Sequence, residues 1–303
     1  MASPARRILL IDDDRMQFRL LQAHFKNFSG EAYALDWAAT YEEGLEKLLF
    51  GTHAACLLDY QLGERDGLQL IREAVARGCL TPIVFLTAET AERVDIEAMN
   101  AGALDYLVKG EITPRMIERS LRYALKLSET LEALRRLATR DQLTGLLNRR
   151  EFERILPEEE ERARRFEHPL ALVMVDIDHF KLVNDTHGHT AGDVVLREVA
   201  RRLTEEVRTV DRVVRFGGEE LVLILVQTDR AGALDVARRV CAAVEKEPVL
   251  VGHTIALNVT VSAGAAALPA DAASGLSLLN AADKALYAAK SRGRNRAVAF
   301  NDL

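Results

Sequence analysis

Cysteine is scarce in this chain, which has only three in 303 residues: Cys56, Cys79 and Cys241. Their wide spacing fits neither a zinc-binding knuckle nor a disulfide framework, so we interpret them as reduced thiols of the core. Long apolar runs are missing as well, since no stretch approaches the roughly 20 residues that a membrane helix needs. These absences argue against a disulfide-stapled or membrane-bound protein and predict a cytoplasmic one with no membrane partner.

Positive charge is also in short supply. Lys and Arg number 40 against 46 Asp and Glu, which gives a net charge of −6. This balance argues against electrostatically driven binding to nucleic acid, and no helix-turn-helix pattern is present to read DNA. The hydrophobic fraction of 49% and the charged fraction of 28% are typical of a globular protein, and the length predicts two domains.

Short apolar runs alternate with amphipathic helical patterns from Arg7 to about Ala124. Five such units predict an α/β fold with a doubly wound, five-stranded parallel sheet. The expected strands are Ile8–Ile11, Tyr33–Trp37, Ala54–Leu58, Ile83–Leu86 and Leu104–Val108.

Polar residues follow these runs, at the edge where such sheets bind ligands. They are Asp12 and Asp13 after the first run, Asp59 after the third, Thr87 after the fourth and Lys109 after the fifth. Three crowded carboxylates favour a hard cation such as magnesium, and one of them could be a nucleophile towards a phosphoryl group. The alternative is that each acid separately solvates a loop or caps a helix.

Residues 6 to 125 resemble the receiver domain of bacterial response regulators. The matching strings are I-L-L-I-D-D-D, L-L-D-Y-Q-L-G-E-R-D-G, P-I-V-F-L-T-A and A-G-A-L-D-Y-L-V-K. The resemblance implies phosphorylation of Asp59 by a cognate histidine kinase, and one bound Mg²⁺. The implied magnesium ligands are Asp12, Asp13, Asp59 and the Gln61 carbonyl, and the implied switch residues are Thr87, Tyr106 and Lys109. Gly110 replaces the usual proline, which we expect to loosen the loop that carries Lys109.

The domain order is predicted as a receiver domain over 1–125, a helical linker over 126–140 and a second domain over 141–303. A long helix is expected from the capping Thr113 and Pro114 to Arg140. Its stripe would let two copies pair in a short coiled coil, giving a homodimer, unless it packs on its own domain. The stripe consists of Leu127, Leu131, Leu134 and Ala138.

Two glutamates, Glu219 and Glu220, follow Gly217-Gly218 in the second half. The glycine pair predicts a hairpin with a tight primed turn, in which both central residues have positive φ. Asp176 ends the apolar run 170–175 and would meet the glutamates if the two strands are neighbours. These carboxylates could hold one or two divalent ions over a triphosphate.

Other residues nearby suit a nucleotide base. Asn184 and Asp193 offer amide and carboxylate groups that match the edge of a guanine. The spacing of His179, His187 and His189 does not match a standard zinc site, so we interpret these as turn and structural histidines.

Four ordered motifs across residues 141–303 resemble the GGDEF family of diguanylate cyclases. They are D-Q-L-T-G-L-L-N-R-R, V-D-I-D-H-F-K-L-V-N-D-T-H-G-H-T-A-G-D, R-F-G-G-E-E-L and A-D-K-A-L-Y-A-A-K-S-R-G-R-N-R. The resemblance implies an α/β nucleotide-cyclase-like domain with a mixed sheet that condenses two GTP into cyclic di-GMP. Implied ligands of two Mg²⁺ are Asp176, the Ile177 carbonyl, Glu219 and Glu220, and the catalytic residues are Asp176, Glu219 and Glu220. Implied substrate contacts are Asn184, Asp193, Phe180, Lys181, Lys290 and Arg294.

Two further features bear on this resemblance. Leu221 stands where the family usually has phenylalanine, and repacking in an apolar strand should tolerate the change. Arg208 and Asp211 match the family's R-x-x-D inhibitory product site, for which a simple i,i+3 ion pair is the alternative. A catalytically weak module that binds GTP or cyclic di-GMP is the alternative function, and the domain order predicts control of the cyclase by phosphorylation of Asp59.

Overall fold

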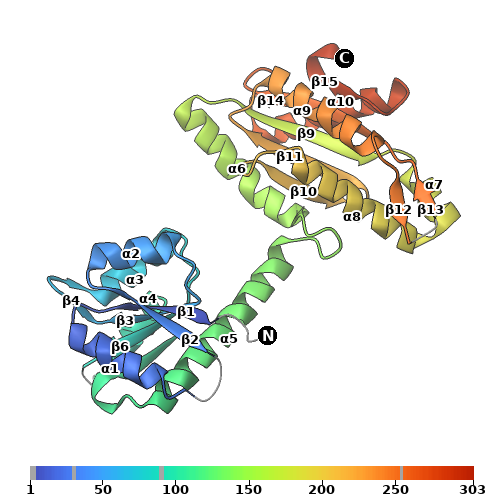
Figure 1. Ribbon diagram of the computed structural model, residues 1–303. Helices are drawn as coiled ribbons and strands as arrows, with labels where there is room; N and C mark the ends of the chain where they lie inside the picture. Colours follow the sequence, from blue (N-terminus) through green and yellow to red (C-terminus); the bar gives the residue numbers. More distant parts are fainter. Residues whose placement is uncertain (1–4, 29–31, 89–91, 253–254) are drawn as a thin grey trace. The chain divides into compact units, whose positions relative to one another are not determined.

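The computed structural model describes residues 5–28, 32–88, 92–252 and 255–303. The chain divides into two compact units, Met1–Arg135 and Arg136–Leu303 (Figure 1). The first four residues of the predicted receiver domain lie outside the described residues. Within the described part of the chain, no helix is both long and apolar enough to cross a membrane.

The first unit is a parallel sheet with the strand order β2-β1-β3-β6-β7. This confirms the predicted five-stranded architecture. The strands are β1 (Arg6–Ile11), β2 (Tyr33–Ala38), β3 (Ala55–Asp59), β6 (Ile83–Thr87) and β7 (Asp105–Val108). The helices are α1 (Arg15–Phe25), α2 (Tyr41–Phe50), α3 (Gly67–Ala76), α4 (Glu92–Ala101) and α5 (Pro114–Thr139).

Alternate residues of these strands feed two cores on opposite faces of the sheet. Leu9 and Ile11 pack with residues of α2 and α3, whereas Ile8 and Leu10 pack with residues of α1 and α5. A strand buried on both faces needs an unbroken apolar run, which is why these strands were readable from the sequence.

Helix α5 begins at the predicted residues, where the backbone N–H of Met116 donates to the Thr113 hydroxyl. Its first half buries Ile117 and Leu121 in the first unit. The side chains of the predicted stripe are exposed instead, with Leu131 at 49% and Leu134 at 57%. The stripe is therefore not packed away against its own unit.

The second unit is built on a mixed sheet with the order β15-β14-β9-β11-β10-β8, which confirms the mixed sheet that the resemblance implied. Strand β9 lies between β11 and β14 and is antiparallel to both. The strands are β8 (Leu147–Asn148), β9 (Leu170–Ile177), β10 (Arg212–Gly217), β11 (Glu220–Val226), β14 (Val261–Leu268) and β15 (Ala297–Ala299). Strands β12 (Val249–Val251) and β13 (Ile255–Leu257) form a separate pair.

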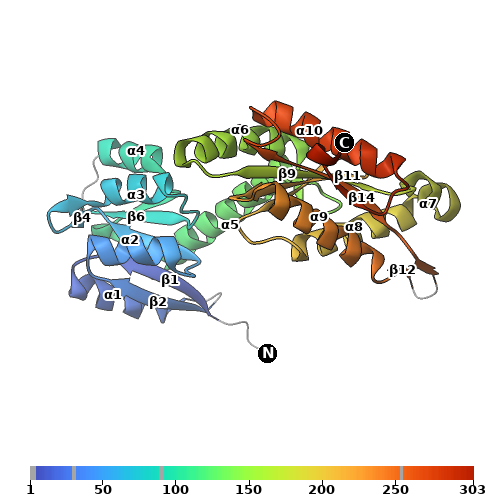
Figure 2. The ribbon, with the colours of Figure 1, turned by 90° about the horizontal axis from the view of Figure 1, so that it is seen from above.

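Helices cover both faces of this mixed sheet, as Figures 1 and 2 show. One core includes residues of α8 and α9, and the other includes residues of α6 and α10. Leu221 is fully buried in the first of these, so the position usually taken by phenylalanine is filled by a packed leucine. The helices are α6 (Arg149–Phe166), α7 (Phe180–His187), α8 (His189–Glu205), α9 (Arg230–Glu245) and α10 (Gly275–Ser291).

Candidate functional sites

Three carboxylates meet at one edge of the first sheet. Asp12, Asp13 and Asp59 each offer an oxygen, and these oxygens lie within 4.8 Å of one another. Among the described residues this is the one group of at least three Asp, Glu, His or Cys side chains that meets so closely. Asp12 and Asp59 are buried because β1 and β3 are adjacent parallel strands that end together.

The ammonium group of Lys109 lies among these acids. Its Nζ is 3.0 Å from Asp12 Oδ2 and 2.8 Å from Asp59 Oδ1. Burial raises the pKa of Asp59 to about 6 and also raises the pKa of Asp12, and Lys109 offsets part of both shifts. Burial also disfavours the charged form of Lys109, but its hydrogen bonds to Asp59 and Asp12 outweigh this and raise its pKa. Oxygen donors whose ionisation is this costly fit a hard divalent cation.

The loop after Asp59 forms a small hairpin that reaches the same site. Strands β4 (Gln61–Leu62) and β5 (Arg65–Asp66) pair, and Gly63 between them has a φ of +64°. The backbone N–H of Gly63 donates to Asp13 Oδ2 at 3.1 Å. The hairpin thereby orients one of the three acids, while the ligand role of the Gln61 carbonyl stays a prediction.

The predicted switch residues lie on the two strands beyond β3. Thr87 is buried at the end of β6, and Tyr106 on β7 is 38% exposed. Gly110 lies within the short 3₁₀ helix η1 (Lys109–Glu111). Lys109 reaches both acids despite this glycine, so the structure shows no displacement of its side chain from the site.

Two of the second-unit acids lie directly opposite each other. In the antiparallel register of β9 and β11, Glu220 pairs with Asp176. The two strands are neighbours in the sheet, as the convergence of these carboxylates requires. The position of Glu220 follows from the hairpin that joins β10 to β11.

The tip of this hairpin differs from the prediction. Gly217 is the last residue of β10 and pairs with Glu220, so the turn consists of Gly218 and Glu219. Of these residues only Gly218 has a positive φ, +43°. The predicted Gly217-Gly218 turn with positive φ at both positions is wrong, because a register irregularity between Arg215 and Gly217 shifts the tip by one residue.

A salt bridge between Arg215 and Asp141 supports the tip of the β10–β11 hairpin. Arg215 donates to the Gly218 carbonyl through Nε at 3.0 Å and Nη2 at 2.8 Å, and its Nη1 is 3.0 Å from both carboxylate oxygens of Asp141. Asp141 also accepts hydrogen bonds from Thr144. These contacts outweigh the effect of burial and lower the pKa of Asp141. Asp141 and Thr144, both in the string D-Q-L-T-G, therefore help to fix the position of the turn that carries Glu219.

Lys290 is paired with Asp176, and its Nζ lies 2.7 Å from Oδ2. Burial raises the pKa of Asp176, with Lys290 opposing and Glu219 adding to the shift. Burial likewise raises the pKa of Glu220, and the charge of Asp176 adds to it. The ammonium group thus lies where a cation is favoured, and the oxygen donor set fits Mg²⁺. The Ile177 carbonyl stays a predicted ligand.

The predicted guanine contacts come from two consecutive helices. Asn184 belongs to α7 and Asp193 to α8, and Gly188 between the helices has a φ of +82°. A Cβ atom on Gly192 would lie 1.9 Å from Asn184 Oδ1. Glycine is therefore required for the Asn184 amide to lie against the first turn of α8, beside Asp193. Phe180, at the start of α7, is buried beneath this arrangement, and Lys181 is exposed.

Lys290 and Arg294 lie on either side of the C-terminus of α10. The Gly293 and Arg294 N–H groups donate to the carbonyls of Lys290 and Ala289, the pattern of a Schellman motif. Gly293 supplies the positive φ that this motif needs, and Arg294 itself has a φ of +62°. Such a conformation costs a non-glycine residue about 1–2 kcal/mol.

Sequence reasoning missed Asp178. This residue is 5% exposed, lies one position after β9, and is the second acid of V-D-I-D. The repeated acid was the only local signal, because its partners Thr260, Ser262 and Asn295 lie 82 to 117 residues further along the chain.

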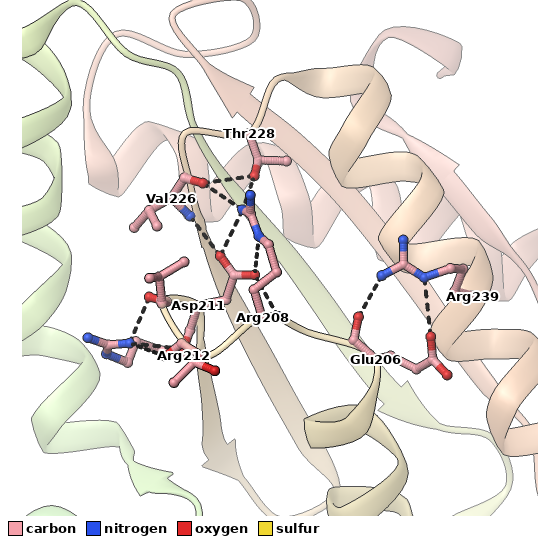
Figure 3. Close-up of polar contacts among 9 residues, drawn as sticks. Glu206, Arg208, Asp211, Arg212, Val226, Thr228 and Arg239 are labelled. Carbon is pink, nitrogen blue, oxygen red and sulfur yellow. Dashed lines mark hydrogen bonds and ion pairs between the residues drawn. The ribbon is translucent and has the colours of Figure 1, made fainter.

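Arg208 and Asp211 form an i,i+3 ion pair, with Nε to Oδ2 at 3.1 Å (Figure 3). Their role as an inhibitory product site stays a prediction. Arg208 also donates to the Val226 carbonyl and to the Thr228 hydroxyl. The Asp211 side chain is only 2% exposed and accepts the Val226 N–H, whereas the Arg208 side chain is 58% exposed. Both residues line a polar cavity of about 730 Å³.

Comparison with known families covers both units. Residues 138–296 match the family described as "Diguanylate cyclase, GGDEF domain", and residues 8–121 match "Response regulator receiver domain". Response regulator PleD of Caulobacter vibrioides is 40% identical over 211 residues, which cover 67% of this chain and 46% of the relative. Diguanylate cyclase DgcP of Pseudomonas aeruginosa is 33% identical over 278 residues, covering 90% of this chain and 39% of the relative. The chain thus spans less than half the length of these two relatives.

Solved structures resemble the second unit. The coiled coil and GGDEF domain of DgcB from Caulobacter crescentus, in complex with c-di-GMP, has a TM-score of 0.55 at 33% identity, covering 61% of this chain and 97% of that one. Diguanylate cyclase SiaD from Pseudomonas aeruginosa, in complex with its activator SiaC, has a TM-score of 0.52 at 41% identity, covering 61% and 70%. The chain therefore belongs to the GGDEF diguanylate cyclase domain family, and a response regulator receiver domain precedes its GGDEF domain.

Proposed function

We propose that this protein is a diguanylate cyclase that condenses two GTP into cyclic di-GMP and two pyrophosphate. The observation that carries the proposal is the alignment of Glu220 with Asp176 across β9 and β11, with Lys290 paired to Asp176. Acids at one strand end with a lysine among them suit the phosphates and metal ions of a nucleoside triphosphate, and Asn184 and Asp193 offer groups that match guanine. Family membership supports the same reading.

The residues divide by the part of GTP that they contact. Asn184 and Asp193 bind the guanine edge, with Phe180 shaping the floor. Lys290 and Arg294 hold the terminal phosphates, together with the backbone at Phe180 and Lys181, and Lys290 leaves Asp176 to do so. The magnesium ligands would be Asp176, the Ile177 carbonyl, Glu219 and Glu220.

Two Mg²⁺ held by these oxygens would supply charge neutralisation of the triphosphate and of the reacting oxygens. The chain's own contribution is placement. The contacts of Arg215 with Asp141 and with the Gly218 carbonyl fix the position of the turn that carries Glu219. Metal ions bound there would then hold the α-phosphorus and its pyrophosphate leaving group in one orientation.

The symmetry of the product requires a second domain. Each GGDEF domain offers one guanine site, and cyclic di-GMP contains two identical halves, so two domains face each other about a two-fold axis. The 3′-oxygen of each GTP attacks the α-phosphorus of the other. The exposed leucines of α5 support a homodimer paired through this helix.

Incubation of the full chain with GTP and Mg²⁺, followed by mass spectrometry, tests the proposal. Cyclic di-GMP should accumulate with the wild type and not with Asp176→Asn. Tight GTP binding without any product would favour the alternative, a nucleotide-binding module. The absence of both binding and product would refute the proposed activity.

The receiver unit would regulate the cyclase through phosphorylation. Phosphorylation of Asp59 by a histidine kinase, with one Mg²⁺ on Asp12, Asp13, Asp59 and the Gln61 carbonyl, would rearrange Thr87, Tyr106 and Lys109. Support comes from the contacts of Lys109 with both buried acids, which an incoming phosphoryl group would replace. Receiver pairing would then raise the effective concentration of one GTP site near the other. The three free cysteines support a cytoplasmic setting.

Product inhibition at Arg208 and Asp211 completes the proposed function. The Arg208 side chain is 58% exposed and lines the cavity of about 730 Å³, together with Arg154, Arg162 and Arg212. Glutamates of the same lining pair with Arg154 and Arg162. Cationic donors on several sides suit the phosphates and guanine oxygens of cyclic di-GMP. Because the Asp211 side chain is nearly buried, the more exposed Arg208 would make the first contact.

A further inference from the structure

We infer that Asp178 is a positioning residue for the triphosphate, because its buried carboxylate holds the loop that carries Arg294 against the end of β9. The inference rests on the proposed function, since it concerns the same GTP site. In the described structure the Asp178 side chain is hydrogen-bonded to Thr260, Ser262 and Asn295, not to the predicted metal-binding or guanine-binding side chains. It would act on the triphosphate through Arg294.

Three donors converge on this one carboxylate. Asp178 Oδ1 accepts from the Ser262 hydroxyl at 2.7 Å, and Oδ2 accepts from the Thr260 hydroxyl at 2.8 Å and from the backbone N–H of Asn295 at 3.0 Å. The backbone N–H of Asp178 also donates to the Thr260 carbonyl at 2.9 Å. Both oxygens of the Asp178 side chain accept here, whereas an Asn side chain offers only one acceptor, so Asp178→Asn must lose or reverse at least one of these hydrogen bonds.

The contact to Asn295 matters because of where this residue lies. Gly293, Arg294 and Asn295 have φ values of +109°, +62° and +47° in succession. Two consecutive non-glycine residues in the left-handed region are strained and persist only when their surroundings fix them. The Ala289 carbonyl fixes one side of this turn, and Asp178 fixes the other.

The result is a link between two halves of the phosphate site. Asp178 follows Asp176 by two residues at the end of β9, and Asp176 is paired with Lys290 one helical turn before the strained loop. Through Asn295 the same strand end also sets the position of Arg294. Lys290, Arg294 and the metal-binding acids are thereby held in one frame, which is what in-line attack at the α-phosphorus needs.

The test separates the phosphates from the base. Binding of 3′-deoxy-GTP, which lacks the attacking hydroxyl and cannot be condensed, is compared with binding of GMP by isothermal titration of the full chain with Mg²⁺. In Asp178→Asn the affinity for 3′-deoxy-GTP should fall roughly tenfold, while the affinity for GMP stays within about twofold. Equal losses for both ligands would show that Asp178 only supports the fold, and would overturn the inference.

A matched control is Asp271→Asn. Asp271 is another nearly buried carboxylate of the same unit, and it accepts from Arg230 and from the Ala267 N–H, away from the loop. Its substitution should leave the ratio of the two affinities unchanged. A change in that ratio as large as that of Asp178→Asn would count against the inference.

Two more variants guard the result. Added to Arg294→Ala, Asp178→Asn should weaken 3′-deoxy-GTP no further, and full additivity would overturn the role assigned through Arg294. If Asp178→Asn does not fold, Thr260→Val removes one donor from Oδ2 and should give a smaller loss, roughly threefold, with the same selectivity. A wild type that binds GMP but not 3′-deoxy-GTP, or neither, would instead refute the proposed GTP site itself.

Discussion

The two acidic sites of this protein use the same components in different architectures. Each has a buried aspartate at a strand end with a lysine salt bridge, Lys109 to Asp59 in the receiver unit and Lys290 to Asp176 in the GGDEF unit. In the receiver, adjacent parallel strands bring three carboxylates within 4.8 Å. In the GGDEF unit the acids come from antiparallel strands and a hairpin turn, and no such triple contact is found among the described residues.

The two arrangements predict different requirements for binding a cation. The receiver acids are already gathered for a single cation, so their site is complete in one domain. Among the described residues the GGDEF acids form no such close group, and Lys290 is paired with Asp176, which suits cations that arrive with a triphosphate. We therefore expect the receiver to bind Mg²⁺ without nucleotide and the GGDEF site to bind it only with GTP.

The largest expected effect separates the sites by loss of one acid. Glu220→Gln should lower cyclic di-GMP formation at least roughly a hundredfold, because it removes charge directly opposite Asp176. Asp13→Asn, the corresponding change in the receiver, should leave the unphosphorylated rate within about twofold. The rate of cyclic di-GMP formation is measured by chromatography. Equal losses in both variants would contradict the separate roles assigned to the two acidic sites.

A second prediction concerns the guanine site. Gly192→Ala places a Cβ atom 1.9 Å from Asn184 Oδ1, so the amide must move. We expect the KM for GTP to rise roughly tenfold with the receiver unaffected. Gly110→Ala is the matched control, because nothing lies within 4 Å of its added Cβ. A normal KM in Gly192→Ala would show that Asn184 does not need its observed place.

The third prediction uses pH on the receiver site. Burial raises the pKa of Asp59 to about 6, so below that pH a proton competes with the cation. Affinity for Mg²⁺ is therefore nearly full at pH 7 and declines as the pH falls through 6, by roughly tenfold between pH 7 and pH 5. Trp37, the sole tryptophan, donates to the Asp12 carbonyl at 2.8 Å, so its fluorescence can report the binding. A pH-independent affinity would contradict the assignment of Asp59 as a ligand.

The smallest expected effect is at the product site. Arg208→Ala should raise the cyclic di-GMP concentration for half-inhibition about fivefold and leave the uninhibited rate unchanged. The variant also takes two donors away from the nearly buried Asp211, so a lower melting temperature is expected beside the weaker inhibition. Unchanged inhibition would favour the alternative of a simple ion pair at a helix end.

The fold was largely readable from the sequence, because fully buried strands such as β3 and β9 are continuous apolar runs. The receiver acids were readable for the same reason, since each follows such a run. The hairpin tip was displaced by one residue, because the register irregularity at Arg215 has no local sequence signal.

Asp178 was missed for a different reason. Its meaning depends on Thr260, Ser262 and Asn295, which only the tertiary fold brings to it. The salt bridge between Arg215 and Asp141 could not be predicted for the same reason, because the two residues are 74 positions apart in the sequence. Local patterns predict elements and single ligands, whereas contacts that position those ligands come from distant parts of the chain.

We propose that the receiver site regulates the cyclase site. The most direct test is the initial rate of cyclic di-GMP formation with and without beryllium fluoride, in wild type and Asp59→Asn, with mass in solution recorded in parallel. We expect a faster rate and a dimeric mass for the treated wild type, and no response in Asp59→Asn. Equal treated rates in the two proteins would contradict it.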